Sequence, residues 1–384
     1  MAKIGFTISD GSDLGDLLVP RDIFSEGGLW LCGYNINGQL GDNTTTNRSS
    51  PVQTIAWGTN WKQASSGASH TAAIKTDGTL WNWGVNFGNL GDNTITSRSS
   101  PVQTITFGTN WKQVDAGSNY TAAIKTDGTL WTWGDNTYGQ LGDNSTSRKS
   151  SPVQTVAFGN NWKQVACGYH TAAIKTDGTL WTWGYNNNGQ LGNNTANNTS
   201  SPVQTISAGT NWKQVSAGRY HTAAIKTDGT LWTWGDNIRG QLGDNTTTDK
   251  SSPVQTIAFG TNWKQVSCGY HTAAIKTDGT LWTWGDNGNG QLGDNTRTTK
   301  SSPVQTITFG TNWKQVSAGY VNTAAIKTDG TLWTWGNNSR GQLGDNTVDS
   351  KSSPVQTIAF GTNWKQVSTS AMAGYNTVIV KDDM

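Results

Sequence analysis

Charged residues are scarce in this sequence, and glutamate is almost absent. Asp, Glu, Lys and Arg make up 14% of the 384 residues, Glu26 is the only glutamate, and the formal net charge is +2. A nucleic-acid interface needs Lys and Arg clustered on one face, and this balance gives no sign of one. Abundant Gly, Asn, Thr and Ser disfavour helices and favour turns and strands. The composition therefore predicts an all-β protein that does not bind nucleic acid.

Cysteine and long hydrophobic runs are also lacking. Cys32, Cys167 and Cys268 are too few and too widely spaced for a disulfide framework. The last two stand where other repeats carry Ala, so we expect small buried residues. No stretch approaches the ~20 apolar residues of a membrane span. Polar residues follow Phe6, so no secretory signal is visible. We expect synthesis in the cytoplasm and no insertion into a membrane.

The sequence is rich in one repeat of about 50 residues. Its marker is the first Trp of a Leu-Trp-x-Trp-Gly motif, found at Trp30, Trp81, Trp131, Trp181, Trp232, Trp282 and Trp333. A fixed period of this length indicates a solenoid, a propeller or an array. Seven units account for the chain after about residue 28, and Trp57 alone of the 21 Trp lies outside a repeat position. The abundance of Trp is therefore architectural.

Each unit contains four short apolar runs separated by turn residues, a pattern typical of strands. In the third unit the runs cover residues 130–133, 153–158, 162–165 and 171–175. Asp-Gly between Lys175 and Leu180 indicates a hairpin, and Pro152 is expected to open its strand. Four strands in each of seven units predict a seven-bladed β-propeller with four-stranded blades.

The two ends of the repeat region predict how the ring closes. Residues 376–382 match the fourth strand of other units, but the chain stops before the Leu-Trp strand that should follow. That partner is Leu29-Trp30 at the other end. One blade shared by both ends would close the ring without an exposed edge. We divide the chain into a non-repeat arm, residues 1–28, interpreted as an anchor, and a propeller, residues 29–384.

The units resemble the regulator of chromosome condensation repeat. Its hallmark is a Trp-Gly-x-Asn-x-x-Gly-Gln-Leu-Gly run followed by Gly-x-x-His, and residues 133–142 and 67–70 fit this pattern. The resemblance implies a seven-bladed propeller. It leaves the function open, because members of this family include a nucleotide-exchange factor, ubiquitin ligase modules and a secreted bacterial β-lactamase inhibitor.

Differences among the seven units predict a binding face. Neighbouring strands run antiparallel, so the loops after the first and the third strand of each unit emerge on one face of the disc. These loops hold all nine tyrosines and seven of the eight arginines, residue types enriched at recognition surfaces. The candidate binding residues are Tyr34, Phe87, Tyr120, Tyr138, Tyr169, Tyr185, Arg219, Tyr220, Arg239, Tyr270, Tyr320, Arg340 and Tyr375. The alternative is that the tyrosines fill the central channel. Four additional residues, 369–372, are expected to enlarge one loop on the same face.

Catalytic chemistry is not visible. His70, His170, His221 and His271 share one repeat position, which other units fill with Tyr120, Asn322 and Asn376. A position that accepts Tyr and Asn predicts a structural hydrogen bond rather than a metal site. The glycine-rich run lacks the Lys of a phosphate loop, and no Ser/His/Asp or Cys/His set stands out. We expect no enzyme activity, no catalytic residue, no cofactor and no metal.

Three hypotheses for the function follow. The first is a recognition propeller on a virion, such as a phage tail protein, that binds a host receptor, a glycan or a neighbouring structural protein, with residues 1–28 docked on an assembly partner. The second is an exchange factor for a small GTPase, although exchange factors of this family use a protruding insertion and the loops here are short. The third is a secreted inhibitor or lectin-like binder, which would require export.

Overall fold

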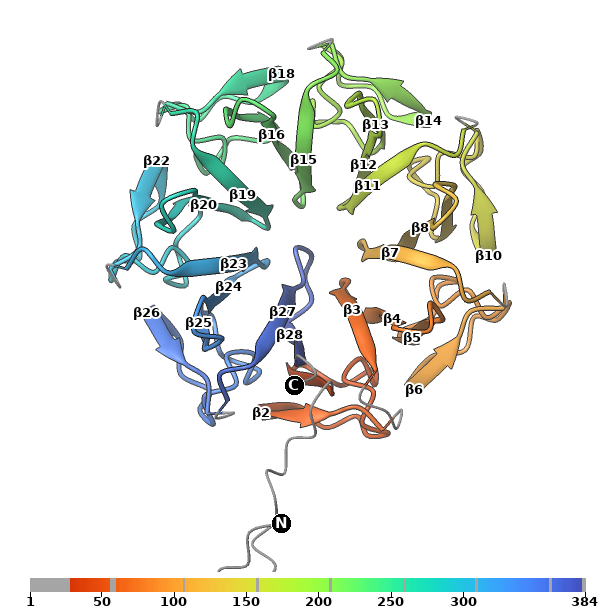
Figure 1. Cartoon of the computed structure of the whole chain (residues 1–384), viewed down its shortest axis with the longest axis horizontal. Coiled ribbons are helices and arrows are strands. Elements are labelled where there is room, and N and C mark those ends of the chain that lie inside the picture. Colours follow the sequence, from red (N-terminus) through yellow and green to blue (C-terminus); the bar gives the residue numbers. More distant parts are fainter. Residues whose placement is uncertain are drawn as a thin grey trace, which may run out of the picture.

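The computed structural model describes residues 28–55, 60–105, 108–156, 159–206, 209–257, 260–307, 310–358 and 361–381. Its 28 strands form seven four-stranded sheets, which are arranged as blades around a central axis (Figure 1). All neighbouring strands within a blade are antiparallel. The predicted seven-bladed all-β propeller is confirmed. The arm, residues 1–28, lies outside the described residues except for Gly28.

We number the blades along the chain and give each from its inner to its outer strand. Blades 1 to 3 are β3 (Trp61–Ser66), β4 (His70–Lys75), β5 (Leu80–Gly84), β6 (Arg98–Gln103); β7 (Trp111–Ala116), β8 (Tyr120–Lys125), β9 (Leu130–Gly134), β10 (Lys149–Gln154); and β11 (Trp162–Cys167), β12 (His170–Lys175), β13 (Leu180–Gly184), β14 (Thr199–Gln204). Blades 4 to 6 are β15 (Trp212–Ala217), β16 (His221–Lys226), β17 (Leu231–Gly235), β18 (Lys250–Gln255); β19 (Trp263–Cys268), β20 (His271–Lys276), β21 (Leu281–Gly285), β22 (Lys300–Gln305); and β23 (Trp313–Ala318), β24 (Asn322–Lys327), β25 (Leu332–Gly336), β26 (Lys351–Gln356).

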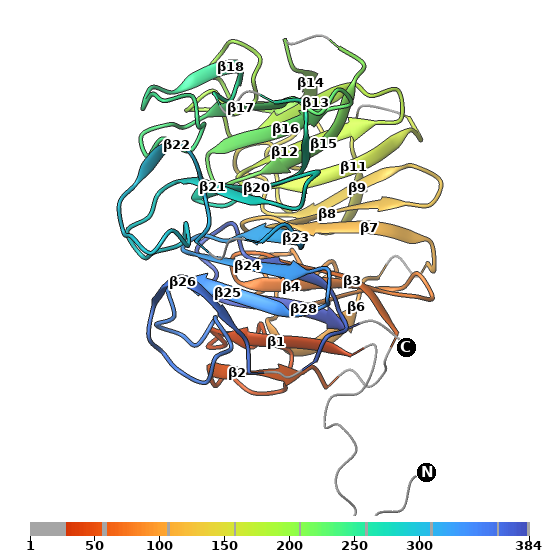
Figure 2. The same cartoon turned by 60° about the vertical axis from the view of Figure 1, so that its left-hand side comes forward.

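Blade 7 is built from both ends of the repeat region. It consists of β27 (Trp364–Thr369), β28 (Asn376–Lys381), β1 (Leu29–Gly33) and β2 (Arg48–Gln53). β1 pairs with β28 along its whole length, from Leu29 opposite Val380 to Gly33 opposite Asn376, and Figure 2 shows the two strands side by side. The predicted closure of the ring by a shared blade is confirmed.

The outermost strands begin earlier than the sequence pattern predicts. β10 runs from Lys149 to Gln154, so Pro152 lies inside the strand and does not open it. The pairing of β10 with β9 is irregular between Lys149 and Val153. An outermost strand has no partner on one side, and an irregular stretch on the other side removes the need for the N–H that proline lacks. Phe158, at the end of the predicted run, lies outside the described residues.

Tryptophan fills the space between neighbouring blades. Trp133 is fully buried and packs with Ile74 of blade 1 and with Trp111, whose ring centroid is 6.0 Å from its own. The Trp133 Nε1–H donates to the carbonyl of Asn89 in blade 1 at 2.9 Å. The indole thus buries a large apolar area and also pairs its one polar atom. Trp131, the other Trp of the motif, lies partly buried on the same cluster, as the two-residue spacing predicts.

Cys167 and Cys268 are buried, as expected, and Cys32 is buried as well. Cys32 stands where the other blades carry the second Trp of the motif, and its Sγ lies 3.5 Å from the Gln342 carbonyl. Burial raises the pKa of the Cys32 thiol to about 12, and nearby Asp345 adds to the shift. A thiol held in this neutral form is a poor nucleophile.

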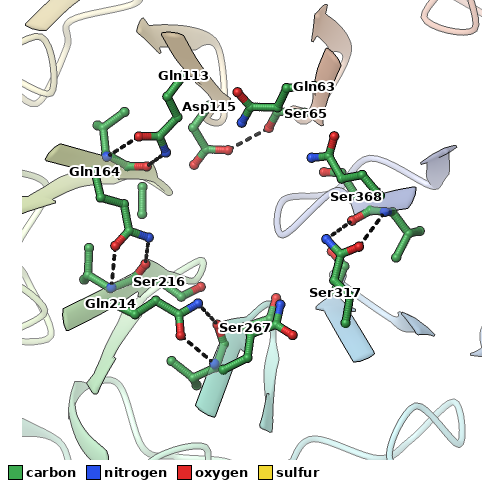
Figure 3. Close-up of a pocket in the computed structure, with 18 of the residues that line it drawn as sticks. Gln63, Ser65, Gln113, Asp115, Gln164, Gln214, Ser216, Ser267, Ser317 and Ser368 are labelled. Atoms are coloured by element: carbon green, nitrogen blue, oxygen red, sulfur yellow. Dashed lines mark hydrogen bonds between the residues drawn. The ribbon is translucent and has the colours of Figure 1, made fainter. Parts of the chain in front are cut away.

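Seven glutamines join the inner strands into a ring, and Figure 3 labels four of them, Gln63, Gln113, Gln164 and Gln214. Gln164 donates through Nε2 to the Val215 carbonyl at 2.9 Å, and its Oε1 accepts from the Val215 N–H at 3.1 Å. The same pair of hydrogen bonds to the next blade recurs at Gln63, Gln113, Gln164, Gln214, Gln265, Gln315 and Gln366. Gln366 bonds to Ala64 and so joins blade 7 to blade 1. These glutamines line a polar central cavity of about 230 Å³.

Removing one of these glutamines should weaken the contact between two neighbouring blades. We expect Gln164→Ala to lower the free energy of unfolding by roughly 1–2 kcal/mol, because two backbone bonds are lost and channel water replaces them only in part. Gln164→Glu should cost at least as much, since a carboxylate cannot donate to the Val215 carbonyl. Thermal unfolding measures both, with exposed Lys163→Ala as the control. Unfolding temperatures equal to that of the control would contradict this role.

Candidate functional site

On the predicted binding face, the loop that joins the two outer strands of each blade is held by hydrogen bonds to a buried asparagine. Asn136 donates through Nδ2 to Asp143 Oδ1 at 3.0 Å and to the Ser145 carbonyl at 3.0 Å, and it accepts from the Leu141 N–H at 2.9 Å. Asn144 then takes a left-handed conformation with φ of 60°, which asparagine tolerates better than most residues. Its N–H donates to the Ser200 carbonyl of the next blade. A rigid frame therefore carries the residues that vary from blade to blade.

Eight tyrosines on this face form two sets of ring contacts with four rings in each, one around Tyr169 and one around Tyr320. They are Tyr34, Tyr138, Tyr169, Tyr185, Tyr220, Tyr270, Tyr320 and Tyr375. Tyr169 and Tyr220 stack with centroids 5.3 Å apart and ring planes at 9°. All eight side chains are partly exposed. We call this set, together with Arg219, the tyrosine arc. It passes through blades 2 to 7.

Arg219 connects the two halves of the tyrosine arc. Its guanidinium carbon lies 5.0 Å from the ring centroid of Tyr220 and 4.9 Å from that of Tyr320. It also lies 5.8 Å from Tyr169 and 5.6 Å from Tyr270. One half-buried cation thus contacts rings from blades 3, 4, 5 and 6, at distances where cation–π attraction is significant. Arg340 makes a similar contact with Tyr34, at 5.5 Å.

Arg219 and five tyrosines of the arc lie on the loops that follow the inner strands, at the end of the central channel that Ala217 and Cys268 line. The loops that follow the inner strands are joined by backbone bonds from blade to blade, such as Arg219 N–H to the Gly269 carbonyl. These loops approach each other closely, because a Cβ atom on Gly168 would overlap with the Gly218 carbonyl oxygen. The four additional residues, 369–372, do lengthen the connection from β27 to β28, in which Thr369 is the last residue of β27, but they turn inward. Ala371 lines the chamber below the mouth and Met372 is 2% exposed.

Three candidate residues lie apart from the tyrosine arc. Tyr120 is fully buried, and its hydroxyl bonds to the His170 carbonyl at 2.8 Å. It fills the histidine position of the repeat, so its expected place among the surface tyrosines is wrong. Phe87 is exposed and contacts Arg148. Arg239 is exposed and lies 4.0 Å from Asp286 of the next blade.

The histidines make the structural hydrogen bond that the sequence predicts. His170 Nε2 lies 2.7 Å from Thr222 Oγ1 of the next blade, and this hydroxyl donates to the Gln190 carbonyl. The threonine therefore accepts from Nε2–H, which assigns the neutral tautomer. Burial lowers the pKa of His170 to about 3, with a contribution from His221. Within the described residues, no three His, Cys, Asp or Glu side chains are grouped to hold a metal.

The buried histidines should make the protein sensitive to acid. A histidine with a pKa of about 3 when folded and about 6.5 when unfolded stabilises the fold fully above pH 6.5. This stability is lost as the pH falls toward 3, because the unfolded chain binds the proton. We expect the stability advantage of the wild type over His170→Asn to shrink by about 1.4 kcal/mol per pH unit between pH 6 and 4.

Calorimetry across this pH range tests the expectation. Asn is the residue that the chain itself uses at this position in Asn322 and Asn376, so the variant should fold. The reverse change, Asn322→His, should add acid sensitivity. A stability difference between wild type and His170→Asn that does not change with pH would show that folding does not lower the pKa of His170.

Asp115 is a channel residue that the sequence analysis missed. It stands where most blades carry Ser, so comparison of the repeats could have found it. Its Oδ1 accepts from Ser65 Oγ at 2.6 Å and its Oδ2 accepts from the Cys167 N–H at 2.7 Å. Desolvation in the narrow channel raises the pKa of Asp115 to about 6 despite these bonds. It is the one charged side chain among the described residues that line the two channel chambers.

Replacing this carboxylate should stabilise the protein at neutral pH. The folded state holds the Asp115 proton more tightly than the unfolded state, so stability falls as the pH rises from about 4 to about 6. We expect Asp115→Ser to gain on the order of 1 kcal/mol at pH 7.5, after allowing for solvent in the channel, and nothing at pH 3.5. Ser216→Asp, the converse change, should lose stability at pH 7.5. Thermal unfolding at both pH values tests this prediction. A gain in stability of Asp115→Ser that persists at pH 3.5 would show that the gain does not come from the ionisation of Asp115.

Comparisons with known proteins place this geometry among related propellers. A family model described as an RCC1-like domain matches residues 23–269 and 163–384, which together span nearly the whole chain. No curated protein matches the sequence. Human WBSCR16 is a similar structure, with 20% identity and a TM-score of 0.81 over 93% of this chain and 99% of its own.

Prp20p from Saccharomyces cerevisiae has the same fold, with 19% identity and a TM-score of 0.82 over 93% of this chain and 92% of its own. Its structure is described together with its binding to Gsp1p and histones. A structure of yeast RCC1 (Prp20) with Kap60 bound gives 17% identity and a TM-score of 0.81, over 99% of this chain and 97% of that one. At these identities the likeness establishes the fold.

The virion hypothesis is wrong. The matching family model is the RCC1-like domain, and the similar propellers are Prp20p and WBSCR16 rather than particle proteins. These findings favour the second hypothesis, an exchange-factor-like regulator, over a phage tail protein. They give no support for a glycan ligand, an assembly partner or a virion location. The described residues contain no helix long and apolar enough to cross a membrane.

Proposed function

Because this chain belongs to the RCC1-like domain family, we propose that it is a non-enzymatic regulator that binds a small GTPase and promotes release of its nucleotide. The tyrosine arc is the observation that carries the proposal. It supplies one extended, partly exposed surface on a single face of the propeller. The binding of Gsp1p that is described for Prp20p, a protein of the same fold, supports the choice of partner.

The tyrosine arc has the properties of a protein-binding surface. Tyrosine offers a large amphipathic area with few rotatable bonds, so little conformational entropy is lost on binding. Ring contacts such as the stack of Tyr169 on Tyr220 already hold these side chains in place. Exposed Ile238 and Phe87 extend the apolar area outward on the same face. A protein partner would therefore meet a surface that needs little rearrangement.

Nucleotide release requires binding energy and no catalytic group. A regulator that binds the nucleotide-free GTPase more tightly than the nucleotide-bound form shifts the population toward the free form. A rigid surface suits this role, because it does not adapt equally well to both forms. Since residues 369–372 turn inward, the rigid tyrosine arc would provide this discrimination in place of a protruding loop.

The decisive experiment measures release of a fluorescent nucleotide from a panel of purified small GTPases that includes Gsp1p. We expect the wild type to accelerate release from at least one member. The variant with Tyr169, Tyr220, Tyr270 and Tyr320 all changed to Ala should lose most of this acceleration, because the centre of the tyrosine arc is removed. Its unfolding temperature should stay close to that of the wild type, since all four side chains are partly exposed.

The matched control is a triple variant at the other end of the inner strands, with Lys163, Lys213 and Lys264 changed to Ala. These exposed lysines lie at the start of β11, β15 and β19, far from the loops that carry the arc. The control should keep full activity. If no GTPase of the panel binds the wild type or releases its nucleotide faster, the proposed function fails. A large fall in unfolding temperature of the tyrosine variant would instead identify the tyrosines as structural filler.

A further inference from the structure

We propose that Arg219 is the receptor for a single carboxylate, the side chain of an Asp or Glu of the bound protein, at the mouth of the central channel. The proposal rests on the proposed function in one respect, that the ligand of the tyrosine arc is a protein. It adds the chemistry of the group that enters the centre of the arc. Four observations lead to it.

The first observation is that Arg219 is a cation without an anion. Six basic residues at one position of the outer loops on this face, such as Arg48 and Lys149, form ion pairs with aspartates of their own loops. Arg239 lies 4.0 Å from Asp286. Arg219 has no carboxylate partner among the described residues, and its Nε is buried without a hydrogen-bond partner there. A buried donor without a partner is costly and marks a place where a ligand atom would be stabilised.

The second observation is the aromatic surround. The rings of Tyr169, Tyr220 and Tyr320 lie within 6 Å of the guanidinium carbon. Aromatic faces attract a cation through their quadrupole, but they leave its charge intact. The full positive charge therefore stays available in a half-buried site, where an ion pair is stronger than on an open surface. The guanidinium is also already oriented, so a carboxylate would bind without ordering a flexible side chain.

The third observation concerns charge balance. The centre of the tyrosine arc holds one cation, because Arg340 contacts Tyr34 at the far end of the arc. The other nearby donors are tyrosine hydroxyls, which carry no positive charge; burial raises the pKa of Tyr220, against the opposing effect of Arg219. One guanidinium matches one carboxylate in charge and in its two-pronged geometry. A phosphate dianion would keep an unmatched charge in this half-buried site.

The fourth observation is that the repeat supplies a variant that keeps the fold. Ala68 and Ser118 occupy the position of Arg219 in blades 1 and 2. Their N–H groups donate to the Gly117 and Gly168 carbonyls at 3.2 Å, as the Arg219 N–H donates to the Gly269 carbonyl at 3.1 Å. The backbone of this loop thus does not depend on arginine. Arg219→Ser removes the cation and leaves a residue that the chain already uses at this position.

The test measures the binding of three peptides, two of them capped and one with a free C-terminal carboxylate, to the full-length protein. They are capped Gly-Gly-Glu-Gly-Gly, the same peptide with Gln in place of Glu, and Gly-Gly-Gly-Gly-Gly with a free C-terminal carboxylate. The readout is the Nε–H resonance of Arg219 in protein labelled with ¹⁵N-arginine, together with the dissociation constant from the titration. We expect the Glu peptide to shift this resonance and to bind at least tenfold more tightly than the Gln peptide. Inorganic phosphate should bind more weakly than the Glu peptide.

Two variants complete the design. Arg219→Ser should abolish the difference between the Glu and Gln peptides, whereas Arg297→Gln, which removes an exposed arginine of the same face, should keep it. If the Glu peptide leaves the Arg219 resonance unchanged, or if phosphate or the free C-terminal carboxylate binds more tightly than the Glu side chain, the inference is overturned. The peptide assay contains no GTPase, so its outcome is independent of the release assay, and each proposal can fail alone.

Discussion

The propeller depends on a glutamine side chain that acts as a peptide group. The inner strand of every blade is a sheet edge, with N–H and C=O groups that no further strand can pair. Gln164 supplies one donor and one acceptor to Val215 of the next blade at 2.9 and 3.1 Å, so a side chain replaces the missing strand. Because the glutamine recurs in every blade, the contact between blades 7 and 1, through Gln366 and Ala64, has the same two hydrogen bonds as the six other contacts between blades. The seven blades are therefore held at fixed positions, and the contacts across the tyrosine arc become possible.

The repeat separates positions that hold the fold from positions that form the proposed binding surface. The polar side-chain atoms of Trp133 and Gln164 form hydrogen bonds with a neighbouring blade, and those of Asn136 form hydrogen bonds within its own loop. These bonds explain why the same residue types recur in the repeat units. Arg219 and Tyr220 occupy loop positions where the backbone bonds are made whatever the side chain is. Tyr120 shows that residue type alone does not decide: the same amino acid is a surface residue at one position and an interior donor at another.

The fold, its closure and the role of the histidines could be predicted from the sequence, because the repeat displays each position seven times. The early start of β10 could not, since an irregular edge strand leaves no period in the sequence. The inward turn of residues 369–372 depends on the free space below the channel mouth. The contacts of Arg219 with four tyrosines depend on distances between blades, which no local pattern encodes. The virion hypothesis failed because low charge and near-identical repeats describe how a chain was duplicated, and they do not specify where it acts.

The shared blade has a consequence for how the binding face is ordered. Gly28 and Lys381 are joined by a backbone hydrogen bond of 3.2 Å, so the two ends of the propeller lie side by side. A short linker could connect them, and new ends could be opened at the Lys-Thr-Asp-Gly turn of any other blade. Every such circular permutant would present the same loops in the same circular order. The loop face of this propeller is thus a cyclic arrangement with no first or last blade, although the chain that encodes it is linear.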